Sequence, residues 1–188
     1  MEPEVSAVRE LTADLFISLD GFASGVQEAA FFGYSGPELG KWVSEHLRQP
    51  QEVIMGRVTY EALARFSAAG TDEISARMRE IPKVVFSRTL SEPLEWENTR
   101  IVRGPAAVEM EAMKQQPGAP LRSMGSISLV KSLMGRGMID RLRLMVFPVV
   151  LGDAGREPIF AGYERMGLEL AHTSVLDSRL MVLEYRPR

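Results

Sequence analysis

Residues 121–152 read LRSMGSISLVKSLMGRGMIDRLRLMVFPVVLG, and the pattern of this stretch predicts the fold. Leu121 to Met124 is a short extended run that ends in the pair Gly125-Ser126. Apolar residues then recur at helical spacing until two further glycines interrupt them. An alternating run begins at Arg141 and is typical of a strand. The stretch therefore predicts a strand, a glycine turn, a helix and a second strand.

The Gly125-Ser126 turn lies directly before the predicted helix. The first N–H groups of a helix have no partner inside the helix, and the helix dipole places positive charge there. Such a turn suits a phosphate or a pyrophosphate. The competing interpretation is plain turn chemistry, because glycine and serine are common in turns that bind nothing.

Composition restricts the class of protein. The 188 residues suit one domain, and a content of 45% hydrophobic and 25% charged residues is that of an ordinary globular protein. A net charge of -3 gives no basic excess for binding nucleic acid or an anionic membrane surface. The sequence has no cysteine, which excludes disulfides and thiolate metal sites and fits the cytoplasm. We expect neither a signal peptide nor a membrane-spanning segment.

Strand and helix patterns alternate along the chain without a linker or a repeat. We expect a loose N-terminal arm over residues 1–10 and a single domain over residues 11–188. Eight strands are predicted, near residues 11–18, 51–55, 83–87, 99–102, 121–124, 141–147, 167–176 and 179–186. With helices between most of them, this order predicts a three-layer α/β/α domain. Its sheet is expected to be mostly parallel, with an antiparallel C-terminal hairpin.

Three of the predicted strands end in turns that suit a phosphate. They are Gly56-Arg57-Val58-Thr59, Ser87-Arg88-Thr89 and Gly125-Ser126-Ile127. Each has a small or hydroxyl residue next to a free backbone N–H, and two of them add an arginine. The planar fork of arginine binds phosphate oxygens in pairs. Three such turns on one sheet are stronger evidence for a phosphate site than one turn. Taken singly, Arg57 and Arg88 also fit ordinary surface turns.

Acidic and aromatic residues after the first strand are candidates for substrate contact. The turn Asp20-Gly21-Phe22 follows the carboxyl end of that strand, where open α/β sheets bind their ligands. Glu38 begins the next predicted helix, and Trp42 lies on its apolar face. Each has a structural alternative. Asp20 suits a turn, Glu38 suits a capping box with Ser35 as N-cap, and Trp42 suits the core.

Other catalytic motifs are missing from the sequence. The two histidines, His46 and His172, belong to no metal or triad motif, and no GxSxG motif occurs, so no metal site is expected. Arg136, Arg141 and Arg143 alternate with apolar residues, which predicts a solvated face or a subunit contact.

Several motifs in a fixed order carry a family resemblance. They are Ile17-Ser18-Leu19-Asp20-Gly21, Val53 to Glu61 (VIMGRVTYE), Lys83 to Leu90 (KVVFSRTL), Gly125-Ser126 through Leu129, Gly137-Met138-Ile139-Asp140 and Pro148-Val149-Val150-Leu151-Gly152. In this order the chain resembles the dihydrofolate reductase-like superfamily over roughly residues 11–160. The likeness is greatest to the reductase domain of riboflavin biosynthesis and its stand-alone bacterial relatives.

The resemblance implies that NADPH lies across the strand ends. The residues implied at its phosphates are Gly56, Arg57 and Thr59 (pyrophosphate and the 2′-phosphate end), Ser87 and Arg88 (2′-phosphate), and Gly125, Ser126 and Ile127 (pyrophosphate). Asp20 and Glu38 are then the acidic candidates for catalysis. Asp20, Gly21, Phe22 and Trp42 are the candidates for contact with the substrate.

The implied reaction is hydride transfer from NADPH to a small pyrimidine- or pteridine-like heterocycle. A substrate like 5-amino-6-(5-phosphoribosylamino)uracil fits, and a homodimer is implied as well. Phe147, where relatives often have histidine, and the charged segment 153–157 depart from the family pattern and leave the substrate open. Two alternatives remain: a protein of this fold that binds NADPH without turnover, and a reductase of an unrelated small substrate.

Overall fold

The computed structural model describes residues 8–26 and 30–188 of the chain. Eight strands form one sheet in the order β5-β4-β3-β6-β1-β7-β10-β9. Their bounds are β1 Leu11–Ser18, β3 Glu52–Gly56, β4 Lys83–Phe86, β5 Thr99–Val102, β6 Leu121–Met124, β7 Arg141–Phe147, β9 Leu168–Leu176 and β10 Leu180–Pro187. The strands from β5 to β7 in this order are parallel, whereas β10 is antiparallel to both β7 and β9. The predicted sheet and its C-terminal hairpin are confirmed.

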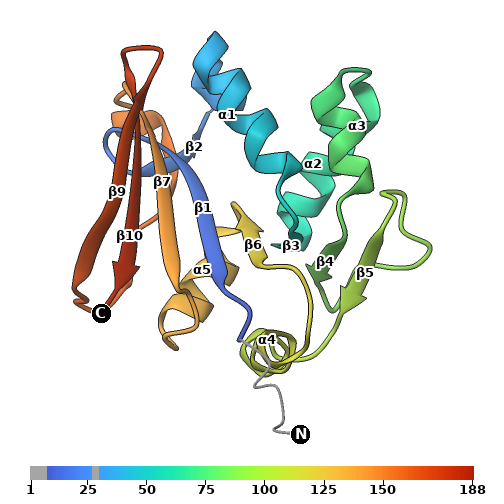
Figure 1. The fold of residues 1–188 in the computed structure, drawn as a ribbon. Helices are drawn as coiled ribbons and strands as arrows, with labels where there is room; N and C mark the ends of the chain where they lie inside the picture. Colours follow the sequence, from blue (N-terminus) through green and yellow to red (C-terminus); the bar gives the residue numbers. More distant parts are fainter. Residues whose placement is uncertain (1–7, 27–29) are drawn as a thin grey trace, which may run out of the picture.

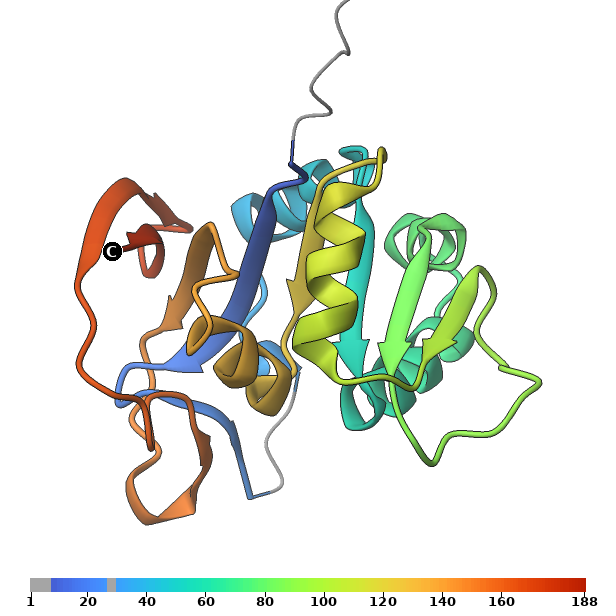
Figure 2. The same cartoon turned by 90° about the horizontal axis from the view of Figure 1, so that it is seen from below.

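Helices cover both faces of the sheet, as Figures 1 and 2 show. One face carries α4 (Ala106–Gln115) and α5 (Ile127–Met134). The other carries α1 (Pro37–Arg48), α2 (Arg57–Ala69) and α3 (Glu73–Glu80). The expected three layers are therefore present. In the ranges that the structure describes, no helix combines the length and the apolar character needed to cross a membrane.

The apolar residues of the strands divide into two sets, one for each face. Alternate residues of β1 lie beneath α4 and α5 and are at most 4% exposed: Leu11, Ala13, Leu15 and Ile17. Burial of each leucine or isoleucine contributes about 1.5–3 kcal/mol. On the opposite face, Met55 of β3 packs with α2 and α3, and Phe147 of β7 packs with α1. Packing on both faces holds the strand ends in fixed positions.

A second, two-stranded sheet lies beyond the carboxyl end of β1. In it, β2 (Phe22–Gly25) pairs antiparallel with β8 (Gly155–Pro158). Short 3-10 turns precede α1 (Ala30–Gly33) and β8 (Gly152–Ala154). Neither β2 nor β8 is among the eight strands predicted from the sequence. The two strands are short and distant in the chain, so neither shows an alternating pattern of its own.

The start of α1 differs from the predicted capping box. Gly36, and not Ser35, is the N-cap residue, and its position has no side-chain cap of its own. Instead, Asp177 in the β9–β10 turn accepts hydrogen bonds from the N–H groups of Glu38 and Leu39, each at 3.0 Å. The carboxylate of Glu38 accepts the N–H of Asp177 in return. The reciprocal bonds of a capping box are therefore present, but Asp177 from a distant turn takes the place of the N-cap side chain.

Two interpretations of charged residues near the sheet also change. Residues 1–7 of the expected loose arm lie outside the described residues, but Arg9 is buried and donates to Glu52 at 2.8 Å. Arg143 is not part of a solvated face, since its side chain is only 16% exposed and pairs with Glu184 at 3.0 Å. Glu184 lies opposite Arg143 in the antiparallel β7–β10 pair, a partnership that appears only when the hairpin folds back.

Candidate functional site

The three phosphate-type turns lie together at the carboxyl ends of the parallel strands, which we call the carboxyl edge of the sheet. Strands β4, β3 and β6 are consecutive parallel neighbours, so their carboxyl ends are side by side. Gly56 ends β3, Ser87 directly follows β4, and Gly125 directly follows β6. Figure 2 shows the parallel strands running in the same direction behind α4 and α5. The structure therefore brings together three segments that are far apart in the sequence.

The hydroxyl of Ser126 joins two of these turns. It accepts a hydrogen bond from the N–H of Gly56 at 2.9 Å and donates one to Oγ1 of Thr59 at 2.8 Å. Gly56 is the N-cap residue of α2, and Ser126 is the N-cap residue of α5. The N-termini of the two helices are thus held next to one another.

Neither helix N-terminus at this edge is capped by a side chain. No side-chain cap bond is made at Gly56 or at Ser126, so the first N–H groups of α2 and α5 stay available. Gly125 and Ser126 have φ angles of 59° and 64°, and a left-handed serine is uncommon. Strain of this kind concentrates at ligand sites. Two adjacent positive helix ends suit a ligand that carries two phosphates.

The arginines predicted at this edge differ in their pairing. Arg57 begins α2 and pairs with Glu61 at 2.8 Å, with 45% of its side chain exposed. Arg88 is exposed and makes no ion pair within residues 8–26 and 30–188. The Ser87 hydroxyl accepts the N–H groups of Thr89 and Leu90 at 3.3 and 3.0 Å, which closes the turn that carries Arg88. Of the two guanidinium groups, that of Arg88 is therefore the more available to a ligand.

Asp20 joins the carboxyl ends of β1 and β7. Its carboxylate accepts hydrogen bonds from the Ser18 hydroxyl at 2.7 Å and from the N–H groups of Leu151 and Gly152 at 3.1 and 2.8 Å. The Ser18 hydroxyl, followed by the Gly152 N–H, lowers the pKa of Asp20 from its ordinary value. The carboxylate is therefore ionised at neutral pH and has no proton to donate.

Three further candidates, the catalytic candidate Glu38 and the substrate-contact candidates Trp42 and Phe22, are held by structural contacts. Glu38 is bonded to the β9–β10 turn, as described above. Trp42 is half-buried, stacks on His46 with ring centroids 3.8 Å apart, and lies edge-on to Phe16 at 6.4 Å. Burial lowers the pKa of His46. Phe22 lies in β2 against Gly155, where an added Cβ would come within 2.5 Å of the Phe22 ring.

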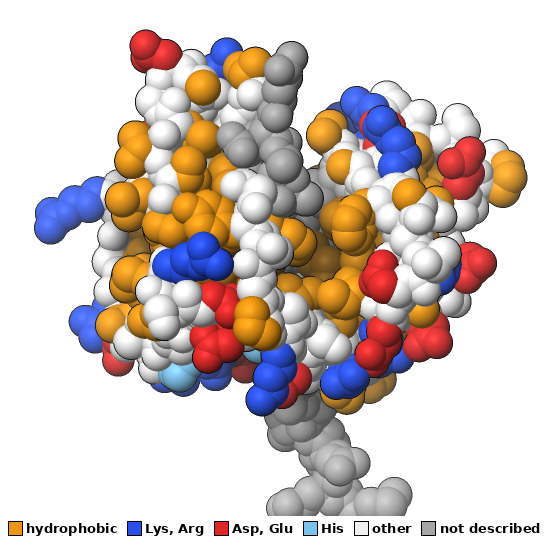
Figure 3. Space-filling model, turned by 90° about the horizontal axis from the view of Figure 1, so that it is seen from above, with side chains coloured by type: hydrophobic (Ala, Val, Ile, Leu, Met, Phe, Trp, Pro, Cys, Tyr) orange, Lys and Arg blue, Asp and Glu red, His pale blue; other side chains and the backbone are white. Residues whose placement is uncertain are grey.

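An aromatic cluster on the α1 side of the sheet was not predicted. Its ring centroids lie 5.2–6.4 Å apart, and its members are Phe16, Phe31, Phe32, Tyr34, Trp42 and Phe147. Figure 3 shows hydrophobic side chains gathered on this side of the molecule and a hollow between two lobes. The aromatic residues between positions 31 and 34 were a usable signal, but nothing local showed that Phe147 would meet them.

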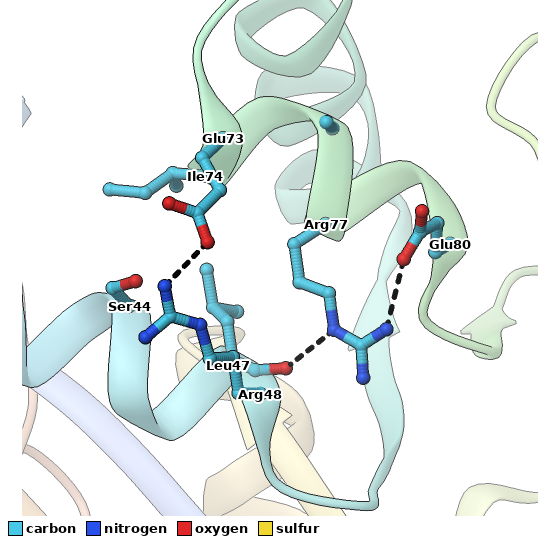
Figure 4. A pocket seen from close by; sticks show the side chains of 8 residues that line it. Ser44, Leu47, Arg48, Glu73, Ile74, Arg77 and Glu80 are labelled. Atoms are coloured by element: carbon cyan, nitrogen blue, oxygen red, sulfur yellow. Dashed lines mark hydrogen bonds and ion pairs between the residues drawn. The ribbon is translucent and has the colours of Figure 1, made fainter.

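Two further hollows lie away from the carboxyl edge. One, of about 230 Å³, lies between α1 and α3, where Arg48 pairs with Glu73 at 2.5 Å and Arg77 with Glu80 at 2.9 Å (Figure 4). The other, of about 500 Å³, lies at the amino ends of the strands and includes the Arg100–Glu52 pair. Each arginine that lines these hollows forms an ion pair with a carboxylate, whereas Arg88 forms none within the described residues. The described residues contain no cluster of His, Asp and Glu suited to a metal ion.

The carboxyl edge fits an anionic dinucleotide better than it fits a neutral ligand. The N-cap residues of α2 and α5 make no side-chain cap bond, the dipoles of both helices place positive charge there, and Arg88 has no carboxylate partner among the described residues. The residues that line the edge are the ones predicted for NADPH from the sequence. Their roles toward that cofactor stay a prediction, whereas their proximity is a fact of the fold.

Comparison with known proteins agrees with this arrangement. The model of the RibD C-terminal domain family matches residues 9–182. An uncharacterized protein of Bacillus subtilis, YyaP, is 26% identical over 184 residues, with 94% of each chain covered. A putative riboflavin biosynthesis protein from Shewanella sp. PV-4 has a similar structure, with a TM-score of 0.69, 18% identity, and 95% of this chain and 99% of that chain covered.

A dihydrofolate reductase has the same fold. The enzyme from Enterococcus faecalis, in complex with NADP(H) and RAB-propyl, gives a TM-score of 0.62 at 14% identity. The match covers 95% of this chain and 96% of that chain. The fold is therefore dihydrofolate reductase-like, as the sequence motifs predicted.

Proposed function

Because the chain belongs to the RibD C-terminal domain family, we propose that it is an NADPH-dependent reductase of a small pyrimidine- or pteridine-like heterocycle. The observation that carries this proposal is the pair of uncapped helix N-termini, tied together by Ser126 at the carboxyl edge of the sheet. A solved structure of the same fold that contains NADP(H) supports the choice of cofactor.

We assign the cofactor's phosphates to the three adjacent turns. The turns that contain Gly56, Arg57 and Thr59 and Gly125, Ser126 and Ile127 would bind the pyrophosphate through the first N–H groups of α2 and α5. The N–H groups of Gly56 and Gly125 themselves are bonded to Ser126 and to the carbonyl oxygen of Asp14, so these two glycines would shape the turns. The hydroxyl of Ser87 and the guanidinium of Arg88 would bind the 2′-phosphate. Arginine suits this task because its fork donates two parallel hydrogen bonds to phosphate oxygens.

Bound NADPH would supply the hydride, so the chain itself has to orient the two reactants and exclude water. Asp20 would border the substrate as an anion, and its bonds to Leu151 and Gly152 would fix the edge beside the nicotinamide. Gly21 and Phe22 follow it in the chain and would complete that border. We assign no proton transfer to Glu38, because its carboxylate accepts the N–H of Asp177.

Two assays test the proposal. In the first, NADPH is expected to raise the melting temperature of the purified protein more than NADH does at the same concentration. In the second, the absorbance of NADPH should fall when 5-amino-6-(5-phosphoribosylamino)uracil or dihydrofolate is added. The proposed cofactor is wrong if neither nucleotide stabilises the protein. Sedimentation of the same sample tests the homodimer that the family resemblance implies.

A second candidate function is cofactor binding without turnover. It is favoured by the state of the two acidic candidates, since Asp20 is held ionised and Glu38 is bonded to a distant turn. This alternative predicts stabilisation by NADPH together with no oxidation of NADPH by either heterocycle. Oxidation with a different small carbonyl or imine compound would instead indicate a reductase of an unrelated substrate.

A further inference from the structure

Arg103 lies at the same edge as the predicted phosphate turns, one strand further out. It directly follows β5, whose last residue, Val102, pairs with Phe86 at the end of β4. The N–H of Ser87 donates to the carbonyl oxygen of Val102 at 3.0 Å. Arg103 is therefore the immediate neighbour of the turn that contains Ser87 and Arg88.

The side chain of Arg103 braces this turn. Its guanidinium donates to the carbonyl oxygens of Arg88 at 3.4 Å and of Leu90 at 3.0 Å. The Ser87 hydroxyl accepts the N–H groups of Thr89 and Leu90 from within the turn. The N–H groups of the turn are thus bound by Ser87, and its carbonyl groups are bound by Arg103.

The charges of Arg88 and Arg103 are not neutralised by the described residues. Both side chains belong to exposed residues, and neither forms an ion pair within the described part of the chain. A guanidinium has five N–H donors, so the two carbonyl bonds of Arg103 leave donors free for a ligand. Two unpaired guanidinium groups at neighbouring strand ends favour a doubly charged anion such as a phosphate monoester.

We propose that Arg103 determines the preference of this edge for an adenosine that carries a 2′-phosphate. It fixes the backbone of the turn that presents Arg88, and it adds a second positive charge beside the phosphate. This inference rests on the proposed function, because it concerns the same cofactor site, and it names a residue outside the motifs that suggested that site. Without Arg103, the edge retains the adenosine and loses most of its selectivity.

The test compares two nucleotides that differ by one phosphate. Adenosine 2′,5′-bisphosphate and 5′-AMP are titrated into the wild type and into R103Q, R103K and R136Q, with binding followed by calorimetry. Arg136 is a matched control, because it is exposed, follows the opposite end of α5 and forms no ion pair among the described residues. Melting temperatures show whether each variant is folded.

We expect R103Q to weaken the bisphosphate about tenfold or more, the size of one lost charged hydrogen bond, and to leave 5′-AMP unchanged. R103K keeps the charge but not the fork, so its loss should be intermediate. R136Q should match the wild type. Equal weakening of both nucleotides by R103Q, or no weakening of either, would overturn the role of Arg103, and R103K decides the same question if R103Q does not fold.

The outcome for the wild type separates this inference from the proposed function. If the wild type binds the bisphosphate no better than 5′-AMP, the 2′-phosphate site itself is absent and the proposed cofactor is wrong. If the wild type prefers the bisphosphate and R103Q keeps the same preference, the cofactor site stands and the inference about Arg103 fails.

Discussion

Arginines in the amino half of the sheet and arginines at its carboxyl edge have opposite surroundings. Arg122 and Arg143 both form ion pairs with Asp14, which is 4% exposed in the middle of the domain. Arg88 and Arg103 are exposed, and within the described ranges no carboxylate pairs with either. The same residue type therefore stabilises the fold in one region and stays available in the other. The difference separates structural charge from charge that suits a ligand.

The greatest loss of stability is expected at Asp14, in the amino half of the sheet. Asp14→Ala would leave Arg122 and Arg143 without a shared partner in a buried site, and should lower the free energy of unfolding by about 3–5 kcal/mol. Urea denaturation measures this loss. The control is Glu45→Ala, which removes an exposed pair with Lys41 and should cost less than about 1 kcal/mol. If both variants lost the same free energy of unfolding, the buried ion pairs of Asp14 would be no more important for stability than an exposed pair.

The next effect concerns the carboxyl edge. Arg88→Ala should weaken NADPH by about tenfold to a hundredfold, the range for a charged hydrogen bond to phosphate, and should leave NADH unchanged. Its melting temperature should stay near that of the wild type, because the side chain has no described ion pair to lose. Arg48→Ala is the matched control, since it removes a charge beside the α1–α3 hollow. Fluorescence titration with both nucleotides would show whether the loss is confined to NADPH.

A smaller effect is expected where structure and binding meet. Ser126→Ala removes the hydroxyl that receives the Gly56 N–H and reaches Thr59, and should lower stability by about 1 kcal/mol. Because the substitution removes the link between the N-termini of α2 and α5, it should weaken the binding of NADPH and of NADH by similar factors. Ser128→Ala, on the exposed side of α5, serves as control. If Ser126→Ala changed the ratio of the dissociation constants for NADPH and NADH, the assignment of the pyrophosphate to Ser126 would be wrong.

The smallest effect is a pH dependence. The pKa of Asp20 is lowered in the folded protein, so its stabilising contribution is complete above the unfolded pKa and disappears as pH falls through the folded pKa. The stability difference between wild type and Asp20→Asn should therefore be present at neutral pH and shrink below about pH 4. Urea midpoints at several pH values measure it. A difference that grows toward acid would mean that Asp20 is protonated in the fold.

Local sequence patterns predicted the regular parts of this molecule. The period-two residues of β1 and the glycine turn before α5 are visible in short windows, and parallel neighbours follow from the alternation of strands and helices. The turn at Ser87 and Arg88 was recognised from its own residues. These features need no knowledge of what lies opposite them in space.

The features that sequence reasoning missed depend on distant partners. Asp177 caps α1 from the β9–β10 turn, and Glu184 neutralises Arg143 from the neighbouring strand. Arg103 follows a short strand without a motif, and its relevance appears only when β5 is placed beside β4. In each case the residue is visible in the sequence, but its partner is fixed by the fold.

We propose that the three turns at the carboxyl edge bind one anionic dinucleotide. Backbone amide NMR of the labelled protein during titration with NADP⁺ is the decisive experiment. Amides at 56–59, 87–90 and 125–127 are expected to shift together and to saturate at a single dissociation constant. Shifts centred instead on the hollow at the amino ends of the strands, around Arg100 and Gln116, would contradict it.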